Sequence, residues 1–394
     1  MEKKFFQNFF RMMQETPYAV RYWDGTEEKY GQGEPEFKII LHDKISETKI
    51  LKDVSLALGE AYMDGKIDFE GDLQKIIEAA YHGGSSFFQK KAFKEIKGLF
   101  RPKRGTSLKQ QEKDIQHHYD LGNDFYALWL DETMSYSCAY FASPENTLFQ
   151  AQLNKIDYTL KKLQLKPGEK LLDIGSGWGW LIIRAAQQYG VEATGITLSR
   201  EQYLKTKERI EELGLTGQVD VRLMDYRDLA KSGEKFDKVV SIGMVEHVGH
   251  ANLPKYFAAV DKLLVPQGLS MLHSITGLIE GPCNKWILKY IFPGGYIPSI
   301  RELIGHLPDF DFHLLDVESL RLHYAKTLDF WAKNFEKHVE KVREKYGERF
   351  VRMWRLYLNS CAASFRVSGL NIHQILFSKG LNNNLEMTRA FLYQ

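Results

Sequence analysis

A glycine-rich stretch at residues 170–181, KLLDIGSGWGWL, carries the residues with the clearest chemical use. A short apolar run ends at Asp173, glycines follow at 175, 177 and 179, and an apolar helical pattern begins at Trp180. Glycines allow positive φ and leave the backbone open to a ligand, and the amides at a helix start favour an anionic group such as a carboxylate. The stretch therefore predicts a strand, a loop and a helix around a nucleotide-like cofactor. Dinucleotide-binding folds and methyltransferases share this pattern, and some such loops serve only tight packing.

The segments after the loop distinguish between these cofactor classes. A second strand is predicted at 192–197 after one helix, which is the spacing of a βαβ unit. A dinucleotide site needs an acidic residue at the end of this strand to bind the ribose, but the chain continues GITLS. A third strand at 219–224 ends at Asp225 and Tyr226, where adenine lies in S-adenosylmethionine enzymes. The order is typical of an α/β class I methyltransferase core.

Two polar side chains lie where the predicted fourth and fifth strands end. Glu246 follows the strand 236–242, and His273 lies near the end of the strand 268–275. Because α/β sheets bind ligands at the carboxyl ends of their strands, these two side chains can face one ligand. Each of them taken singly is more often a satisfied core residue than a catalyst.

Length and composition indicate the number of domains and the classes of partner that the chain can have. The chain has 394 residues, 44% of them hydrophobic, which predicts two domains with packed cores. A net charge of +2 gives no global attraction to nucleic acid. Cys138, Cys283 and Cys361 are odd in number and widely spaced, as in a reducing cytoplasm, and form neither a disulfide framework nor a metal cluster. No apolar run approaches the roughly 20 residues that span a bilayer.

The N-terminal third predicts a small auxiliary domain. Residues 1–14 read as an amphipathic helix, which either docks on its own domain or rests on a membrane interface. A strand at 37–41 and a helical stretch at 56–65 follow, and the domain ends near residue 100. The last strand of the chain is expected at 374–377.

Two further segments are unusual in composition. Residues 90–113 contain nine basic and two acidic residues with phenylalanines between them, which fits nucleic acid, an anionic membrane surface or a solvated linker. Residues 277–307 form an apolar insertion after the fifth strand. An apolar insertion at that edge suits a lipid tail better than a polar metabolite, although it could be a cap packed on its own domain. The apolar insertion favours membrane over nucleic acid for the basic segment.

Taken together, several motifs resemble the cyclopropane-fatty-acyl-phospholipid synthases over nearly the whole chain. They are HHYDLGNDFY, MSYSCAYF, LLDIGSGWGWL, GITLS, GMVEHVG, GLSMLHSIT, HYAKTL and YLNSCAASFR. The segment LGEAYMDGKIDFEGDL looks like the N-terminal domain of the bacterial members that act on phospholipids, which mycolic acid cyclopropane synthases lack.

The resemblance implies a Rossmann-like class I S-adenosylmethionine-dependent methyltransferase core with helical lipid-binding insertions. Residues 1–105 would form the auxiliary domain and basic linker, and residues 106–394 the catalytic domain. The implied reaction adds a methylene group to the cis double bond of an acyl chain in a membrane phospholipid. The enzyme would work in the cytoplasm, bound peripherally to the inner face of the membrane, with no nucleic-acid partner; a homodimer stays open.

The resemblance also implies two sets of site residues. The base in this family is a bound bicarbonate, whose holders would be Cys138, Glu246, His273, the backbone of Ile275, and Tyr324. The cofactor S-adenosylmethionine would contact Tyr119, Tyr136, Ser137, Gly175 and Gly177 at its methionine end, Thr197, Leu198 and Gln202 at the ribose, and Asp225 and Tyr226 at the adenine. Asp173 is expected to order the loop rather than touch the ligand.

Two other functions are compatible with the motifs. A C-methyltransferase acting on the same lipids would leave a methyl or methylene branch instead of a ring, and would share every motif. A non-catalytic module that binds lipid or S-adenosylmethionine is the second alternative. The presence of both Glu246 and His273 argues against it.

Overall fold

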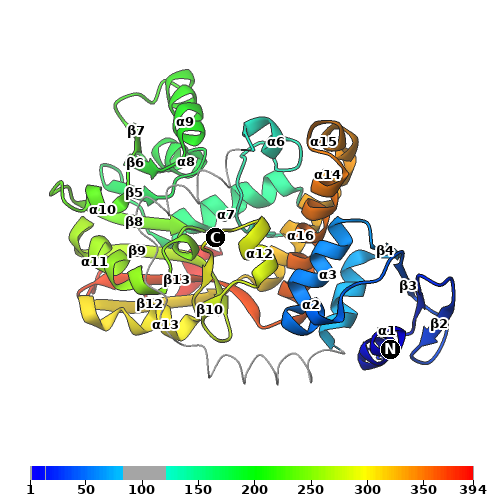
Figure 1. The fold of residues 1–394 in the computed structure, drawn as a ribbon. Helices are drawn as coiled ribbons and strands as arrows, with labels where there is room; N and C mark the ends of the chain where they lie inside the picture. The colour runs from blue at the N-terminus through cyan, green and yellow to red at the C-terminus, as the bar shows by residue number, and fades with distance from the viewer. Residues whose placement is uncertain (1, 14, 83–120, 394) are drawn as a thin grey trace. The chain divides into compact units, whose positions relative to one another are not determined.

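The computed structural model describes residues 2–13, 15–82 and 121–393, which form two units (Figure 1). The first unit takes its described residues from Met1–Lys103, Cys283–Pro293 and Leu328–Gly369. The second takes them from Arg104–Pro282, Gly294–Thr327 and Leu370–Gln394. The domain boundary predicted between residues 105 and 106 and the basic segment 90–113 both lie outside the described residues.

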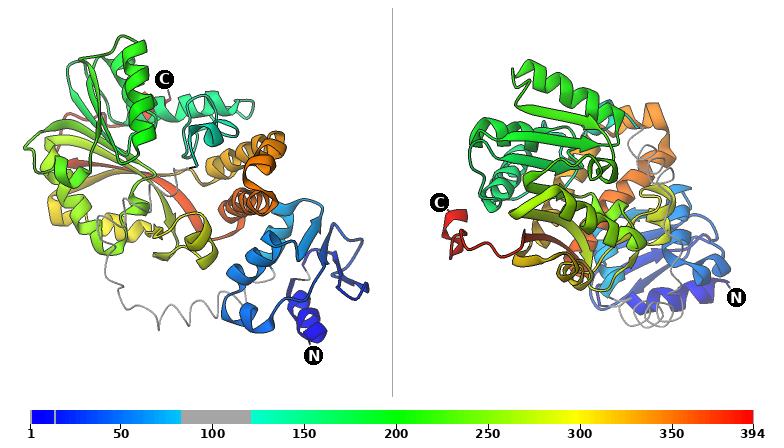
Figure 2. Two further views of the ribbon diagram at one scale, coloured as in Figure 1. Left: turned by 45° about the horizontal axis from the view of Figure 1, so that its top comes forward. Right: turned by 90° about the vertical axis from the view of Figure 1, so that its left-hand side faces the viewer.

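A seven-stranded sheet forms the centre of the second unit, in the order β12-β13-β9-β8-β5-β6-β7. The neighbours β5 (Lys170–Ile174), β6 (Glu192–Thr197), β7 (Val219–Leu223), β8 (Phe236–Ile242) and β9 (Leu264–Gly277) pair in parallel. In contrast, β13 (Leu370–Lys379) runs antiparallel to β9 and to β12 (Phe312–Ser319). Figure 2 shows the twist of this sheet in two further views.

Helices cover both faces of the sheet, which is why its strands read as apolar runs. One face carries α7 (Leu148–Lys162), α8 (Trp180–Tyr189) and α9 (Arg200–Glu212). The other carries α10 (Tyr226–Leu229), α11 (Leu253–Leu263) and α13 (Ile300–Gly305). The start of α7 is fixed by a capping box between Thr147 and Gln150. The predicted α/β sheet is confirmed, whereas β12 had no prediction and β13 is longer than the strand expected at 374–377.

The first unit contains a four-stranded sheet of order β2-β1-β3-β4. Its strands are β1 (Tyr18–Arg21), β2 (Glu27–Tyr30), β3 (Phe37–Leu41) and β4 (Ile67–Glu70), joined by helices α2 (Glu47–Lys52) and α3 (Val54–Met63). The N-terminal helix α1 (Glu2–Phe10) and the short η1 (Arg11–Met13) bury Phe6, Phe10 and Met13 in this core. These side chains also line an apolar cavity of about 600 Å³ inside the unit. The amphipathic helix therefore docks its apolar face on its own unit.

The insertion after β9 divides between the units. Its helix α12 (Lys285–Tyr290) belongs to the first unit, where Trp286 donates from Nε1 to Sδ of Met63 at 3.2 Å. A Cβ on Gly59 of α3 would lie only 2.4 Å from the Trp286 ring, so the two helices depend on glycine for their close approach. This part of the insertion is a cap packed on its own protein, which was the alternative to a lipid-facing surface.

The later helices are α14 (Arg321–Lys337), α15 (Val339–Tyr346) and α16 (Glu348–Val367). Among the described residues, no helix combines the length and the apolar character that crossing a bilayer requires.

Candidate active site

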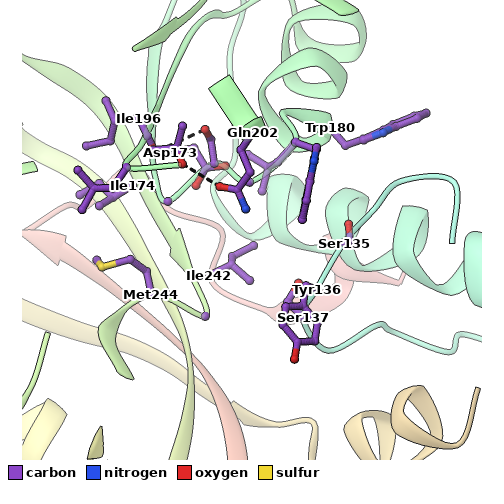
Figure 3. A pocket seen from close by; sticks show the side chains of 18 of the residues that line it. Ser135, Tyr136, Ser137, Asp173, Ile174, Trp180, Ile196, Gln202, Ile242 and Met244 are labelled. Atoms are coloured by element: carbon purple, nitrogen blue, oxygen red, sulfur yellow. Dashed lines mark hydrogen bonds between the residues drawn. The ribbon is translucent and has the colours of Figure 1, made fainter. Parts of the chain in front are cut away.

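A pocket lies at the carboxyl ends of β5, β6, β7 and β8 in the second unit (Figure 3). Five groups of residues contribute to its wall: the segment before α7, α7 itself, the glycine loop with the start of α8, the ends of β6 and β7 with the helices that follow them, and the turn after β8. In Figure 3, Ser135, Tyr136 and Ser137 lie on one side of the pocket, opposite Ile174, Ile196 and Met244. This is the edge at which parallel sheets bind ligands.

The three glycines of the loop are needed for different physical reasons. Gly175 and Gly179 have φ of +90° and +85°, and a Cβ there would press on Met244 at 3.1 Å and on Thr206 at 2.3 Å. Gly177 also has positive φ, +55°, but a Cβ there would meet no protein atom within 4 Å. Since Gly177 lines the pocket, its missing side chain leaves space for a ligand. The loop therefore serves both packing and binding.

Nine of the ten residues predicted to contact the cofactor lie together in this wall. They are Tyr136, Ser137, Gly175, Gly177, Thr197, Leu198, Gln202, Asp225 and Tyr226. The tenth, Tyr119, lies outside the described residues. Thr197 donates from Oγ1 to Oε1 of Gln202 at 2.8 Å, which joins two of the residues predicted to contact the ribose. The Asp225 carboxylate is held by two hydrogen bonds of 2.7 Å from the Arg227 guanidinium, and Arg227 also lines the pocket.

Sequence reasoning missed two basic residues in the wall, Lys155 and Arg227, and did not assign Asp173 to the ligand, although Asp173 lines the same wall. Asp173 was expected to order the loop, yet its Oδ1 is buried and makes no hydrogen bond to any described residue. Burial raises the pKa of Asp173 to about 7. Lys155 lies in α7 and is only 4% exposed. The available signal was a lysine on the face of α7 that also carries the buried Ala151, Ile156 and Tyr158.

A second polar group lies where β8 and β9 end. Gly243 donates its N–H to the carbonyl of His273 at 2.9 Å and so joins the two strand ends. Glu246 lies in the short helix η2 (Val245–His247), where Oε1 accepts a 2.7 Å hydrogen bond from the backbone N–H of Ile275. His273 and Ile275 are two residues apart on one strand, so their side chains share a face of the sheet. The structure thus brings Glu246, His273 and Ile275 together.

Two atoms of this group are buried without a hydrogen-bond partner among the described residues: Oε2 of Glu246 and Nε2 of His273. Burial raises the pKa of Glu246 to about 7 and lowers the pKa of His273 to about 3. His273 is therefore neutral at physiological pH. Gln374, its cross-strand neighbour on β13, was not predicted, and its Nε2 lies 3.2 Å from Nδ1 of His273.

Cys138 and Tyr324 are the two remaining residues that were predicted to hold the bicarbonate. Cys138 is fully buried, and its thiol donates to the carbonyl of Ala139 at 3.2 Å. Burial raises the pKa of this thiol, which excludes a thiolate nucleophile at neutral pH and leaves a holding role. Tyr324 is 9% exposed in the first turn of α14, and the N–H of Ala139 donates to Thr327 one turn later at 3.0 Å. The segment containing Cys138 is thereby attached to the helix that carries Tyr324.

Comparison with known proteins identifies the family of this chain. A family model described as mycolic acid cyclopropane synthetase matches residues 106–375, and a second, described as a domain of unknown function, matches residues 5–92. The chain belongs to the mycolic acid cyclopropane synthetase family. It is an enzyme of the methyltransferase class, as the sequence motifs predicted.

Two relatives and one solved structure show the range of this family. A "Probable fatty acid methyltransferase" of Pseudomonas putida is 38% identical over 96% of both chains. The cyclopropane-fatty-acyl-phospholipid synthase of Escherichia coli (strain K12) is 38% identical over 86% of this chain and 87% of its own. The crystal structure of mycolic acid cyclopropane synthase CmaA1 complexed with SAH and CTAB is 35% identical, with a TM-score of 0.64. The alignment covers 68% of this chain and 98% of the CmaA1 chain.

The family fits the cofactor pocket of the site. A cyclopropane synthase of this family binds SAH, and the predicted S-adenosylmethionine contacts that the structure describes line one pocket here. S-adenosylmethionine is accordingly supported as the cofactor.

Proposed function

We propose that this enzyme transfers a methylene group from S-adenosylmethionine to the cis double bond of an unsaturated acyl chain in a membrane phospholipid. The product is a cyclopropane ring, formed through a carbocation on the acyl chain that loses a proton. The relative from Escherichia coli, named for this activity, supports the proposal.

One observation carries the proposal: the unpartnered Oε2 of Glu246 and Nε2 of His273 at neighbouring strand ends. A buried polar atom without a partner is costly, so such atoms indicate a missing ligand. With Gln374 donating to Nδ1, the neutral His273 ring carries its proton on Nε2 and offers a donor. Glu246, whose pKa is near 7, also offers a donor in its protonated form. Donors of this kind fit a small oxyanion such as bicarbonate, and the residues that would hold it are Glu246, His273, Cys138 and Tyr324.

The chain's own residues have two tasks in this proposal. Bound S-adenosylmethionine supplies an electrophilic methyl group and bicarbonate supplies a base, and the protein must position the double bond between them. Such positioning is worth roughly 7 to 11 kcal/mol. Tyr136, Trp178 and Trp180 give the pocket an aromatic wall. Aromatic faces stabilise a desolvated cation by about 2 kcal/mol or more, and a dry wall keeps water from it.

A peripheral membrane contact follows from the substrate, since an acyl chain must leave a bilayer to reach the pocket. We propose that the enzyme binds the inner face of the membrane from the cytoplasm through the basic residues 90–113. Anionic lipid surfaces attract a nearby Lys or Arg by about 1 kcal/mol each.

The second candidate function is a C-methyltransferase on the same lipids. The relative from Pseudomonas putida favours it, because it is named a fatty acid methyltransferase and aligns over 96% of both chains. The two functions share the cofactor and the lipid, and they differ in whether the added carbon bonds to both alkene carbons and closes a ring or stays on one of them as a methyl or methylene branch.

Incubation with vesicles of cis-monounsaturated phospholipid and methyl-labelled S-adenosylmethionine tests the proposal. We expect the label in the lipid acyl chains. Label in protein or nucleic acid, with none in lipid, would contradict both lipid functions.

A further inference from the structure

The Lys155 ammonium is buried in the wall of the cofactor pocket, where no described carboxylate forms a direct ion pair with it. Among the described residues its hydrogen-bond partner is Ser137, whose Oγ lies 3.1 Å from Nζ, and no carboxylate lies within ion-pair distance. A buried charge is costly unless it is paired. Burial lowers the pKa of Lys155 to about 8, although Asp131, Cys138 and Asp173 act in the opposite direction. The free enzyme therefore holds a cation that a bound anion would stabilise.

The same stretch of α7 also fixes the segment that lies beside Lys155. Gln152, one turn earlier, donates from Nε2 to the carbonyl of Ser137 at 2.9 Å and to that of Ser135 at 3.3 Å. Lys155 thus binds the Ser137 side chain, and Gln152 binds the backbone carbonyls of Ser135 and Ser137. Because this segment lines the pocket, the ammonium has a fixed place there.

The charges of this wall match one end of the cofactor. The methionine moiety of S-adenosylmethionine carries a carboxylate, an ammonium and a sulfonium. An ammonium such as Lys155 is repelled by the two cationic groups and attracted by the carboxylate. Asp173, whose Oδ1 is unpartnered in the same wall, has the opposite preference. A lysine and an aspartate in the same pocket wall offer partners of both signs to the zwitterion.

We propose that Lys155 binds the carboxylate of the methionine moiety of S-adenosylmethionine. The proposal rests on the cofactor assignment made above, and it adds a contact that the sequence motifs did not contain. The other anion to consider is the base. However, Glu246, His273, Cys138 and Tyr324 are not part of the wall that contains Lys155. Placement in the wall with Ser137 and Gly175 therefore favours the cofactor.

Calorimetric binding of two ligands tests this contact directly. The probes are S-adenosylhomocysteine and its decarboxylated analogue, titrated into wild type and Lys155→Met. Losing one partner of a buried charge pair should raise the Kd of S-adenosylhomocysteine by about 10- to 100-fold. The Kd of the decarboxylated analogue should change by less than about threefold, because the lost partner has nothing to contact there.

Lys162→Met is the matched control. Lys162 lies two turns later on α7, is 1% exposed and pairs with Glu318, but it does not line the pocket. Its removal should leave both Kd values unchanged. Lys155→Arg keeps the charge and should keep most of the preference for the carboxylate. An equal loss for both ligands in Lys155→Met, or no loss for either, would overturn the proposal.

A second measurement needs wild type alone, in case Lys155→Met does not fold. The groups that act electrostatically on Lys155 are Asp131, Cys138, Asp173 and His273. As pH rises above 8, Lys155 loses its proton, so the preference for S-adenosylhomocysteine over the decarboxylated analogue should fall. A preference that is constant from pH 7 to 9.5 would contradict the contact. These readouts use no lipid, so they can fail while lipid methylation stands.

Discussion

Gln374 lies directly opposite His273 in the pairing of β13 with β9, and its Nε2 is 3.2 Å from Nδ1 of the imidazole. This contact fixes the tautomer that leaves a donor on Nε2, the unpartnered atom of the ring. The orientation of His273 is therefore set by the antiparallel strand at the end of the chain.

Replacing Gln374 with Met should release that constraint. We expect kcat to fall by at least about tenfold, because the imidazole would no longer be held in the tautomer and orientation that present a donor at Nε2. The Kd of S-adenosylhomocysteine should not change, since Gln374 does not line the cofactor pocket. Nitrogen chemical shifts of His273 would report the tautomer. A mutant with unchanged kcat and tautomer would exclude this positioning role.

Glu246→Ala and His273→Ala should separate chemistry from cofactor binding. Loss of a group that helps remove a proton costs about 100-fold or more in turnover. The Kd of S-adenosylhomocysteine should stay within about threefold of wild type, and added bicarbonate should restore part of the lost rate. The roles would be wrong if both mutants lost cofactor affinity and kept a normal rate at saturation.

Glu246 should also make stability depend on pH. Its pKa rises from 4.5 in the unfolded chain to about 7 in the fold. Below pH 4.5 both states hold the proton; between 4.5 and 7 only the folded state does, so the wild type loses stability as pH rises. Glu246→Gln lacks this loss, which amounts to at most about 3 kcal/mol.

Denaturant unfolding of both proteins at pH 5, 6, 7 and 8 measures the difference. The Gln variant should gain free energy of unfolding relative to wild type up to about pH 7, with no further gain above it. A constant difference across this range would mean that Glu246 is not buried in a form that resists ionisation.

Gly177→Ala tests the open space in the loop. Its Cβ would enter the pocket, so the affinity for S-adenosylhomocysteine should fall by more than about tenfold. Gly214→Ala is the control, because Gly214 has a similar φ of +66° and an equally open Cβ position outside the pocket. Both variants carry about 1 to 2 kcal/mol of backbone strain. Equal affinities in the two variants would show that the loop only packs.

Replacing Lys90, Lys91, Lys94 and Lys97 with Gln tests the proposed membrane contact. Vesicle binding and activity on anionic vesicles should fall, and more so at low salt where the attraction is strongest. Activity on detergent-dispersed lipid should persist. The control replaces Lys205, Lys207, Lys231 and Lys235, which gives the same charge change elsewhere. Equal sedimentation of both variants with vesicles would leave residues 90–113 as a solvated linker.

The described residues that were predicted to contact the cofactor lie in one pocket because they belong to short motifs at strand ends. The glycine loop, GITLS and Asp225-Tyr226 each follow a strand, so the sheet order alone brings them together. Gln374 and Lys155 were missed for a different reason. The position of Gln374 depends on the antiparallel return of β13, and that of Lys155 on the face that α7 presents to the sheet. The sequence pattern at these residues does not encode such long-range pairing. The sequence left the 277–307 insertion open between a lipid-facing surface and a cap, because only the fold shows Trp286 packed against α3.

The most direct test of the central claim uses S-adenosylmethionine with a fully deuterated methyl group and vesicles of cis-monounsaturated phospholipid. Ring closure requires loss of one deuteron from the transferred methyl, so the acyl product should carry a CD2 group in a saturated ring. Its chromatographic retention and fragmentation distinguish that ring from a methylene branch of equal mass. A product that keeps the intact CD3 group, or one that fragments as a methylene branch, would contradict cyclopropane formation and establish the branching methyltransferase instead.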